Sequence, residues 1–426
     1  MVFLTTIVVL LVLLVIGIPI AISLFVSGLV GYMMTIDIQP GLTALAQIAF
    51  GHLNSFVLAA IPLYVFMGQI MLKGGSGKDL FDFAQRVVGK LPGGLGVAAI
   101  FACAIFAAIS GSSTATVATI GSISIPEMLK RGYERKITAG AVAVSGSLGI
   151  LIPPSISFIL YSLVTSTSVG KLFMAGFIPG IMLALMFAAY TVLVSIFDRS
   201  KHVTKDSTKI PLTFEMFGII AMIFIVLGGI YLGYFTPTEA AAAGVAYALL
   251  FTVFVKRTLT LRLFWAATRD TVASSAMILM LVAGAAVFGN TLSLLRVPQD
   301  LTMWLSGLDL SPWHFLLAVN VLFLVLGMFM DASAAILVTV PILLPGLEHF
   351  DIDLIWFGVI LVINMEIGAV TPPVGMNLFV VKALRPDYAI SEILMGSLPF
   401  AMLGLVGLAL VMVFPEIALF LPQFMK

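Results

Sequence analysis

Two pairs of short polar or Gly-Pro strings interrupt the long apolar stretches of this sequence. The first pair is Ser110-Gly111-Ser112-Ser113-Thr114 with Gly149–Pro154, and the second is Asp331-Ala332-Ser333 with Gly368–Pro373. A Pro-Pro pair removes helix hydrogen bonds, and glycine permits the backbone angles of an unwound stretch. Unpaired backbone groups at membrane depth are tolerated only where they are buried in protein or line a polar cavity. We therefore expect the chemistry of this chain at these strings.

Oxygen atoms at the tips and breaks suit a hard cation such as Na⁺, because carbonyl, hydroxyl, amide and carboxylate oxygens are its preferred kind of ligand. The helices that restart after each tip and break present positive N-termini, which attract carboxylates. Together these features fit an anion carried with Na⁺. The predicted Na⁺ ligands are Ser110, Ser112, Ser145, Gly149, Asp331, Ser333, Asn364, Gly368 and Thr371. The predicted substrate contacts are Ser112, Ser113, Thr114, Pro153, Pro154, Ser333, Thr371 and Pro372.

Each of these residues also has a purely structural interpretation. Serine and threonine in membrane helices often bond their own backbone or hold helices together. Asp331 is also suited to cap the second arm of a hairpin. Glu366, just before the second break, is a functional candidate as an intramembrane carboxylate, or a structural partner on a protein-facing side.

Composition indicates an integral membrane protein. The 426 residues are 61% hydrophobic and 10% charged, whereas soluble proteins carry roughly 25% charged residues. The single Cys103 excludes an internal disulfide, and the four histidines lack metal-ligand spacing. No HExxH or GxSxG string is present, so we expect neither an enzyme nor a cofactor other than Na⁺ as coupling ion. The expected surroundings are a lipid bilayer, with no nucleic-acid partner, and the apolar N-terminus is expected to be a first membrane helix rather than a signal peptide.

The positions of the basic residues predict the topology. Eighteen of the 21 Lys and Arg residues fall in five clusters, which the positive-inside rule places in the cytoplasm. Clusters flank segment 95–129 on both sides, so this segment should enter and leave on one side as a re-entrant hairpin; two short spans are the alternative. The same reasoning makes 312–346 a second hairpin that enters from outside, with both termini in the periplasm.

The two halves of the chain repeat each other at a constant offset of 219 positions. Gly149, Pro153 and Pro154 fall on Gly368, Pro372 and Pro373, and the hairpin tips coincide as well. Five crossings in each half predict that the second repeat is inverted, an arrangement typical of secondary transporters. The predicted fold is an all-α polytopic membrane protein with two inverted repeats. The expected boundaries are repeat one over 1–197 with hairpin 95–129 and broken helix 135–165, a cytoplasmic linker over 198–212, and repeat two over 213–426 with hairpin 312–346 and broken helix 354–384.

Four strings carry a resemblance to a known family: ISGSSTATVATIGSISIPEM (109–128), GILIPPSISFILY (149–161), GGIYLGYFTPTEAAAAG (228–244) and GAVTPPVGMNLF (368–379). In these strings, and over nearly its whole length, the chain resembles the large membrane (M) subunit of a TRAP (tripartite ATP-independent periplasmic) transporter. The resemblance implies a bacterial inner-membrane protein that works with a separate small four-helix membrane subunit (Q) and a periplasmic substrate-binding protein (P). It also implies an elevator-type transporter of the ion-transporter superfamily.

The implied activity is Na⁺-driven import of an organic acid such as a C4-dicarboxylate, a sialic acid or a 2-oxo acid. We expect Na⁺ to order the hairpins first and the anion to bind between the tips before the loaded domain moves inward. A stand-alone Na⁺/carboxylate symporter of a related two-hairpin family is the alternative. An ion channel and an intramembrane enzyme are the rivals from other functional classes.

Overall fold

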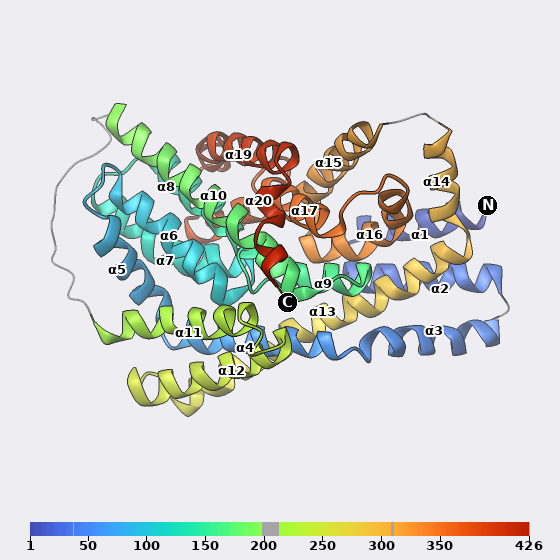
Figure 1. The fold of residues 1–426 in the computed structure, drawn as a ribbon, viewed down its shortest axis with the longest axis horizontal. Coiled ribbons are helices and arrows are strands. Elements are labelled where there is room, and N and C mark those ends of the chain that lie inside the picture. Colours follow the sequence, from blue (N-terminus) through green and yellow to red (C-terminus); the bar gives the residue numbers. More distant parts are fainter. Residues whose placement is uncertain (37, 198–212, 308–310, 426) are drawn as a thin grey trace.

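The computed structural model describes every residue except 37, 198–212, 308–310 and 426, so the predicted linker lies outside the described residues. The described part of the chain is built from helices and contains no β-strand (Figure 1). This confirms the predicted all-α class. Nearly all of its buried apolar side chains belong to one continuous cluster.

Eight helices within the described residues are long and apolar enough to cross a membrane by length and composition. The chain is therefore a multi-pass membrane protein. The apolar N-terminus, expected to be a first membrane helix, forms the short helix α1 (Val2–Val15, 14 residues), and α2 (Ile20–Thr35, 16 residues) follows it. At 1.5 Å per residue they extend about 21–24 Å, less than the ~30 Å hydrocarbon core of a bilayer.

Helices of the two halves pack together along one side of the molecule (lower part of Figure 1). The long helix α13 packs against α2, α3 and α4, and α12 packs against α4 and α11. The bounds are α3 Ile38–Leu53, η1 Phe56–Ala59, α4 Ala60–Lys73, α11 Phe214–Tyr231, α12 Pro237–Leu250 followed by the π-helical turn η4 Phe251–Val255, and α13 Leu261–Leu294.

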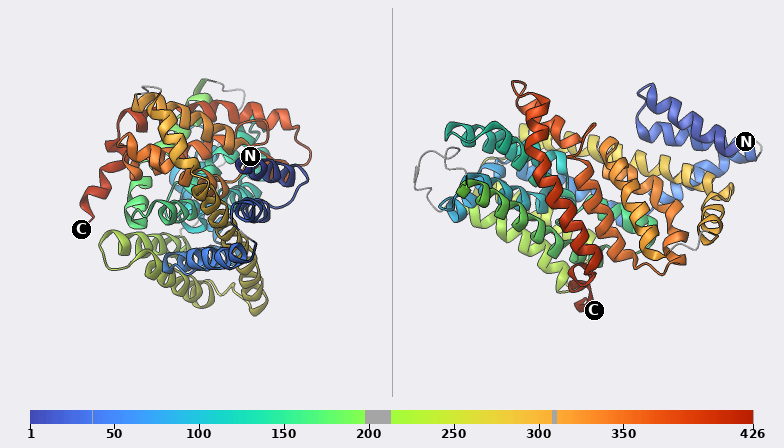
Figure 2. Two further views of the ribbon diagram at one scale, coloured as in Figure 1. Left: turned by 90° about the vertical axis from the view of Figure 1, so that its right-hand side faces the viewer. Right: turned by 90° about the horizontal axis from the view of Figure 1, so that it is seen from above.

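Two helical hairpins reach the middle of the molecule from opposite ends (Figures 1 and 2). The first consists of α6 (Gly94–Ser110) and α7 (Ser113–Lys130), and the second of α15 (Pro312–Phe329) and α16 (Ala332–His349). The arms have 17 or 18 residues, close to the ~20 residues that a helix needs to cross a bilayer. Arm length alone therefore does not distinguish a re-entrant hairpin from two short spans, and the re-entrant course of both segments stays a prediction.

Two interrupted helices pass beside the hairpin tips. The first is α8 (Arg135–Ser147), a short turn η2 (Leu148–Ile150) and α9 (Ile156–Thr165); the second is α17 (Leu354–Gly368) and α18 (Met376–Leu384). Both Pro-Pro bonds at the breaks are cis. Each half then ends on a long helix, α10 (Val169–Phe197) and α19 (Ile390–Val413), and a short C-terminal segment follows, α20 (Glu416–Leu419) and η5 (Leu421–Phe424).

The helix bounds keep the offset of 219 residues closely. Helix α7 shifted by 219 coincides with α16, and α8, α9 and α6 shifted likewise begin within one residue of α17, α18 and α15. The inversion of the second half across a bilayer and the domain boundaries stay predictions.

Three elements differ from the sequence-based expectation. The predicted repeat implies matching elements in the two halves, but the separate helices α3 and α4 of the first half correspond to one continuous helix, α13, in the second. Two further helices, α5 (Ser76–Val88) and α14 (Val297–Ser306), lead into the hairpins and were not predicted. Both are amphipathic and short, so a search for long apolar runs misses them.

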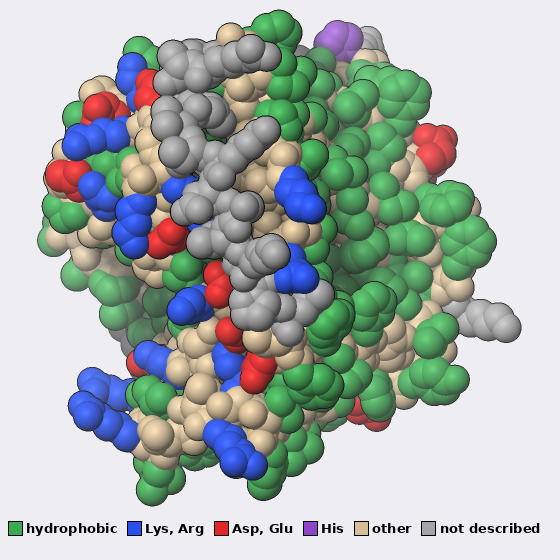
Figure 3. Space-filling view, turned by 90° about the vertical axis from the view of Figure 1, so that its left-hand side faces the viewer, with side chains coloured by type: hydrophobic (Ala, Val, Ile, Leu, Met, Phe, Trp, Pro, Cys, Tyr) green, Lys and Arg blue, Asp and Glu red, His purple; other side chains and the backbone are tan. Residues whose placement is uncertain are grey.

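Basic side chains gather at the end of the molecule that carries α5 (Figure 3). Two ion pairs there join helices of the first half to helices of the second. Lys73 on α4 pairs with Asp270 on α13 at 2.8 Å, and Asp79 on α5 pairs with Lys256 just after η4. One of the five basic clusters that the sequence shows, at residues 199–209, lies outside the described residues.

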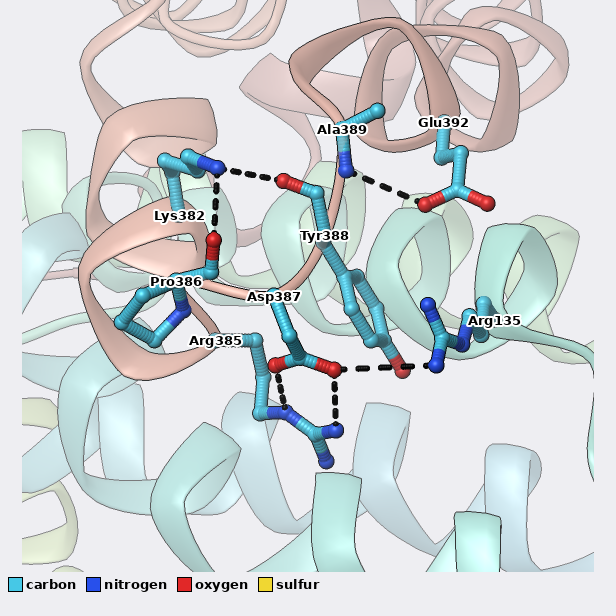
Figure 4. A network of polar contacts seen from close by, with 8 residues as sticks. All are labelled: Arg135, Lys382, Arg385, Pro386, Asp387, Tyr388, Ala389 and Glu392. Carbon is cyan, nitrogen blue, oxygen red and sulfur yellow. Dashed lines mark hydrogen bonds and ion pairs between the residues drawn. The ribbon is translucent and has the colours of Figure 1, made fainter.

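A polar network joins the two interrupted helices at their outer ends (Figure 4). Asp387, after α18, accepts two hydrogen bonds from Arg385 at 2.8 and 2.7 Å and pairs with Arg135 of α8 at 3.7 Å. The guanidinium groups of Arg135 and Arg385 both lie over the ring of buried Tyr388, at 5.3 Å and 4.9 Å from its centre respectively. The hydrogen bonds from Arg385 lower the pKa of Asp387 from 3.8 to about 2. This network fixes α8 against the α18–α19 turn.

Candidate functional site

A cavity of about 520 Å³ lies between the two hairpin tips. Helices α4 and α13 close it on the side away from the interrupted helices, through residues such as Gln69 and Ser274. Six predicted site residues line it: Ser110, Ser112, Ser113, Thr114, Asp331 and Ser333. The structure thus brings together both predicted tips, which lie more than 200 residues apart in the sequence.

The first tip is held by a compact set of hydroxyl groups. Ser112 is the N-cap residue of α7, and its hydroxyl accepts a hydrogen bond from Ala115 N at 3.5 Å. Thr116 donates to the carbonyl of Ser112 at 2.8 Å, and its hydroxyl lies 2.8 Å from that of Ser110. The capping satisfies a helix-end amide that would otherwise lack a partner. Oxygen atoms therefore converge on the tip without any ionised side chain.

The second tip has a carboxylate at the corresponding place. Asp331 is the N-cap residue of α16 and accepts a hydrogen bond from Ser333 N at 2.9 Å. Its side chain is exposed and lines the cavity. The two roles that the sequence predicts for Asp331, helix cap and Na⁺ ligand, are therefore compatible. One carboxylate oxygen caps the helix, and the group still lines the cavity.

Each break packs directly against hairpin backbone. A Cβ atom added to Gly149 would lie 2.8 Å from the Ser112 carbonyl oxygen, and one added to Gly111 would lie 2.9 Å from the carbonyl oxygen of Pro154. In the second half, a Cβ on Gly368 would lie 2.6 Å from the Cα of Gly327 in α15. These distances leave no room for a side chain, so glycine is what allows the backbones to touch.

The remaining predicted residues do not line the cavity. Ser145 donates to the Ala141 carbonyl of its own helix α8, and Thr371, in the break, donates back to the Ile367 carbonyl of α17, as the structural interpretation has it. Asn364 donates to Asn320 of α15, and its carbonyl oxygen is buried without a partner among the described residues. The other members of this group are Gly149, Pro153, Pro154, Gly368 and Pro372, which form the backbone of the breaks.

Asn377 is a lining residue that the sequence analysis missed. It lies on α18 of the second half, is fully buried, and donates to Ser113 Oγ at 2.7 Å and to the Ala143 carbonyl at 3.2 Å. The Ser113 hydroxyl in turn lies 2.9 Å from Asn377 Oδ1. An amide directly after a helix break was the signal available in the sequence, because buried polar groups in membrane helices seek partners.

Four helix N-termini and one carboxyl group contribute charge to the cavity. The first residues of α7, α9, α16 and α18 all line it: Ser113, Ile156, Ala332 and Met376. Helix N-termini carry partial positive charge and free N–H groups, so they can hold an anion. Among the described residues that line the cavity, Asp331 is the only ionisable one, and no Lys, Arg or His takes part. The arrangement can bind a carboxylate together with a cation.

Comparisons with known proteins agree with this architecture. Residues 7–417 match the family model described as the DctM component of the tripartite ATP-independent periplasmic transporter. The C4-dicarboxylate TRAP transporter large permease protein DctM of Pseudomonas aeruginosa is 40% identical, and the match covers 93% of this chain and 94% of that one.

The names of two further relatives state other substrates. The sialic acid TRAP transporter large permease protein SiaM of Vibrio cholerae is 35% identical over 96% of this chain and 95% of its own length. The ectoine TRAP transporter large permease protein TeaC of Halomonas elongata is 34% identical over 96% of each.

The YdaH transporter of Alcanivorax borkumensis has a similar fold. Its crystal structure superposes with a TM-score of 0.64 over 89% of this chain and 90% of that one, at 15% identity. The sequence relatives are permease components and not enzymes, as predicted. The length and identity of these matches bear out the resemblance carried by the four strings, and the chain belongs to the DctM family of large membrane subunits of tripartite ATP-independent periplasmic transporters.

Proposed function

We propose that this chain imports a small organic acid together with Na⁺, and that the acid binds between the two hairpin tips. The observation that carries the proposal is the set of four helix N-termini facing one cavity that has no cationic side chain among its described lining residues. Backbone N–H groups bind a carboxylate without the strong desolvation cost of a buried Lys or Arg. Names of relatives support an acidic or zwitterionic solute, with C4-dicarboxylate in the name of one that is 40% identical.

Na⁺ has a defined electrostatic task in this scheme. The Asp331 carboxylate would repel a substrate carboxylate in the same cavity unless a cation lies between them. Na⁺ at the second tip removes that repulsion, and Na⁺ at the first tip would use hydroxyl and carbonyl oxygens around Ser110 and Ser112. Ion and acid then bind cooperatively, because each favours the same ordered arrangement of the tips.

The proposed movement of the site across the membrane follows from the division of the helices into two groups. The hairpins and interrupted helices hold the candidate site, while α2, α3, α4, α12 and α13 form a separate layer that closes one wall. Sliding of the first group against the second would carry the site across the membrane, as in an elevator. The gathering of basic side chains at the α5 end supports a cytoplasmic position for that end, by the positive-inside rule.

Transporters of this family work with a small membrane subunit and a periplasmic binding protein, and we propose both as partners here. The bacterial inner membrane is then the location, with both termini in the periplasm. The binding protein would deliver the acid to the face opposite the basic end. A chain that transports by itself, as a two-hairpin symporter, is the second candidate.

Uptake into liposomes tests the proposal. Vesicles containing this chain and its candidate small subunit should accumulate one member of a panel of succinate, a 2-oxo acid and a sialic acid, only with binding protein and an inward Na⁺ gradient. Uptake by this chain alone would instead establish the stand-alone symporter. A flux that rises linearly with solute concentration and does not depend on Na⁺ would overturn both the tripartite transporter and the stand-alone symporter.

A further inference from the structure

A second, much smaller cavity lies on the far side of the interrupted helices. Its volume is about 10 Å³, and residues from α8, α10, α17 and α19 enclose it. A cavity of this size holds about one water molecule. Two of its lining residues are polar, Ser147 at the end of α8 and Glu366 near the end of α17, and the rest are apolar or glycine. It shares none of its lining residues with the large cavity.

Glu366 is buried with an unsatisfied oxygen. Its exposed fraction is 3%, and Oε1 has no hydrogen-bond partner among the described residues. Burial of an ionised carboxylate without a partner is costly enough that it needs a counter-charge or loses its charge. No Lys, Arg or His lines this cavity in the described part of the chain, so the protein supplies no fixed positive charge there.

The surrounding helix ends increase the demand for positive charge. Val144 and Ser147 lie in the last turn of α8, and Glu366 and Ile367 lie in the last turn of α17. Helix C-termini carry partial negative charge, which favours a cation nearby. The Ile367 carbonyl already accepts hydrogen bonds from Val370 N and the Thr371 hydroxyl, and the Val144 carbonyl accepts one from the Ser147 hydroxyl. The large cavity has the opposite character, because four helix N-termini face it.

The two polar residues occupy equivalent places in the two halves. Ser147 and Glu366 are 219 positions apart, the offset that superposes the repeats. The Ser147 hydroxyl donates to the Val144 carbonyl at 2.6 Å, which leaves its oxygen lone pairs for another partner. A hydroxyl and a carboxylate from equivalent positions thus meet where α8 and α17 of the two halves come together.

We propose that Glu366 and Ser147 form a cation site at the junction of the two halves, and that it takes one Na⁺ ion. The single carboxylate balances one monovalent charge, the volume accepts one ion of water size or less, and oxygen is the ligand type that Na⁺ prefers. The site is separate from the tips. For its role in transport this inference rests on the proposed Na⁺ coupling, since an ion held here would move with the interrupted helices.

Binding of ²²Na⁺ to the purified full chain, at saturation and at constant pH in choline buffer, tests the site without any transport. Glu366→Gln keeps the shape of the side chain and should lower the number of ions bound per chain by one. Ser147→Ala should keep the number and weaken one class of ion by about tenfold, as expected for loss of one uncharged ligand of a charged group. Glu416→Gln, the same change on an exposed helix, should match the unmodified protein.

Asp331→Asn separates failure of this site from failure of the proposed function. Loss of one ion in Asp331→Asn and of a second in the double variant with Glu366→Gln would support two distinct sites. If Asp331→Asn loses an ion but Glu366→Gln and Ser147→Ala bind as the unmodified chain does, the junction site is wrong while Na⁺ coupling stands. If the unmodified chain binds no Na⁺, both the junction site and the proposed Na⁺ coupling are wrong.

Discussion

Ser112 and Asp331 are the N-cap residues of the second arms of the two hairpins, and they lie 219 positions apart. Both line the same cavity, one with a hydroxyl and the other with a carboxylate. The two caps differ in detail, because Ser112 accepts from the amide of Ala115 and Asp331 from that of Ser333, and only Asp331 can carry a charge. This difference makes it possible to separate helix capping from ion binding by substitution.

Asp331→Asn should raise the Na⁺ concentration for half-maximal uptake by about tenfold or more, because it removes the one negative charge of the cavity lining. Asparagine caps a helix as well as aspartate does, so the melting temperature should stay nearly unchanged. Asp331→Ala should show the same loss of Na⁺ affinity and a lower melting temperature besides. Unchanged Na⁺ dependence in folded Asp331→Asn protein would leave Asp331 with a capping role alone.

Substrate affinity should depend on Na⁺. Replacing Na⁺ by choline should weaken binding of the organic acid by roughly 5- to 150-fold, the usual range for two coupled ligands. By linkage, saturating acid should tighten Na⁺ binding by the same factor. Calorimetric titration in both orders measures this coupling, and equal acid affinities in the two salts would exclude it.

Gly149→Ala should disturb the contact between break and tip. Its new Cβ would lie 2.8 Å from the Ser112 carbonyl oxygen and 3.0 Å from Ser113 N, so backbone must shift. Overpacking of this kind costs about 1–3 kcal/mol. We expect a lower melting temperature and weaker Na⁺ binding.

Gly289→Ala is the matched control for this substitution. No described atom outside its own helix segment lies within 4 Å of a Cβ built at Gly289 of α13, so the same chemical change meets open space. In a helix it should be neutral or stabilising by up to about 1 kcal/mol. Equal behaviour of the two variants would show that the first tip does not depend on the break.

Ser113 and Asn377 should be energetically coupled across the two halves. Asn377→Ala leaves Ser113 and the buried Ala143 carbonyl without their shared partner, which costs about 1–3 kcal/mol. Ser113→Ala removes the same hydrogen bond from the other side. In a double-mutant cycle of unfolding free energies, the double variant should lose at least about 0.5 kcal/mol less than the sum of the two. Strict additivity would show that the contact contributes nothing to the fold.

Asp387 should stabilise the fold in a pH-dependent way. Its pKa falls from 3.8 to about 2 in the folded chain, chiefly through hydrogen bonds from Arg385. A carboxyl with a lowered folded pKa contributes stability above pH 3.8, and that contribution is lost as the pH falls toward 2. Asp387→Asn should therefore have a lower melting temperature than the unmodified protein at pH 7, and the difference between the two melting temperatures should become smaller below pH 4. A difference that is the same at pH 7 and pH 3 would contradict the stabilising role of ionised Asp387.

Much of the helical layout could be predicted from the sequence. The Pro-Pro pairs and the Gly and Ser strings fix where helices must stop, so the hairpins and interrupted helices appear at the expected places. The capping role of Asp331 was predicted for the same reason, because capping is a local property of the chain, whereas Ser112 was predicted only as a ligand and proves to be a cap as well.

Contacts between distant segments could not be predicted in this way. Asn377 pairs with Ser113 of the other half, and Gln69 and Ser274 enter the cavity from α4 and α13. Ser145 and Thr371 donate to the nearby carbonyls of Ala141 and Ile367, and the sequence alone does not show which face of a helix meets the cavity. Helix α5 is recognisable only by a buried stripe that includes Leu80, Phe81 and Ala84, a pattern that a search for apolar runs passes over.

The unbroken helix α13 has a consequence for how this protein fits its lipid surroundings. Its 34 residues form a rod about 50 Å long, whereas the hydrocarbon layer is ~30 Å thick. Such a rod must lean within the bilayer or extend into the headgroups. Because α13 also lines the large cavity, bilayer thickness should influence the rod's inclination and with it the shape of that cavity. We therefore expect solute uptake to depend on the acyl-chain length of the lipids in which the protein is reconstituted.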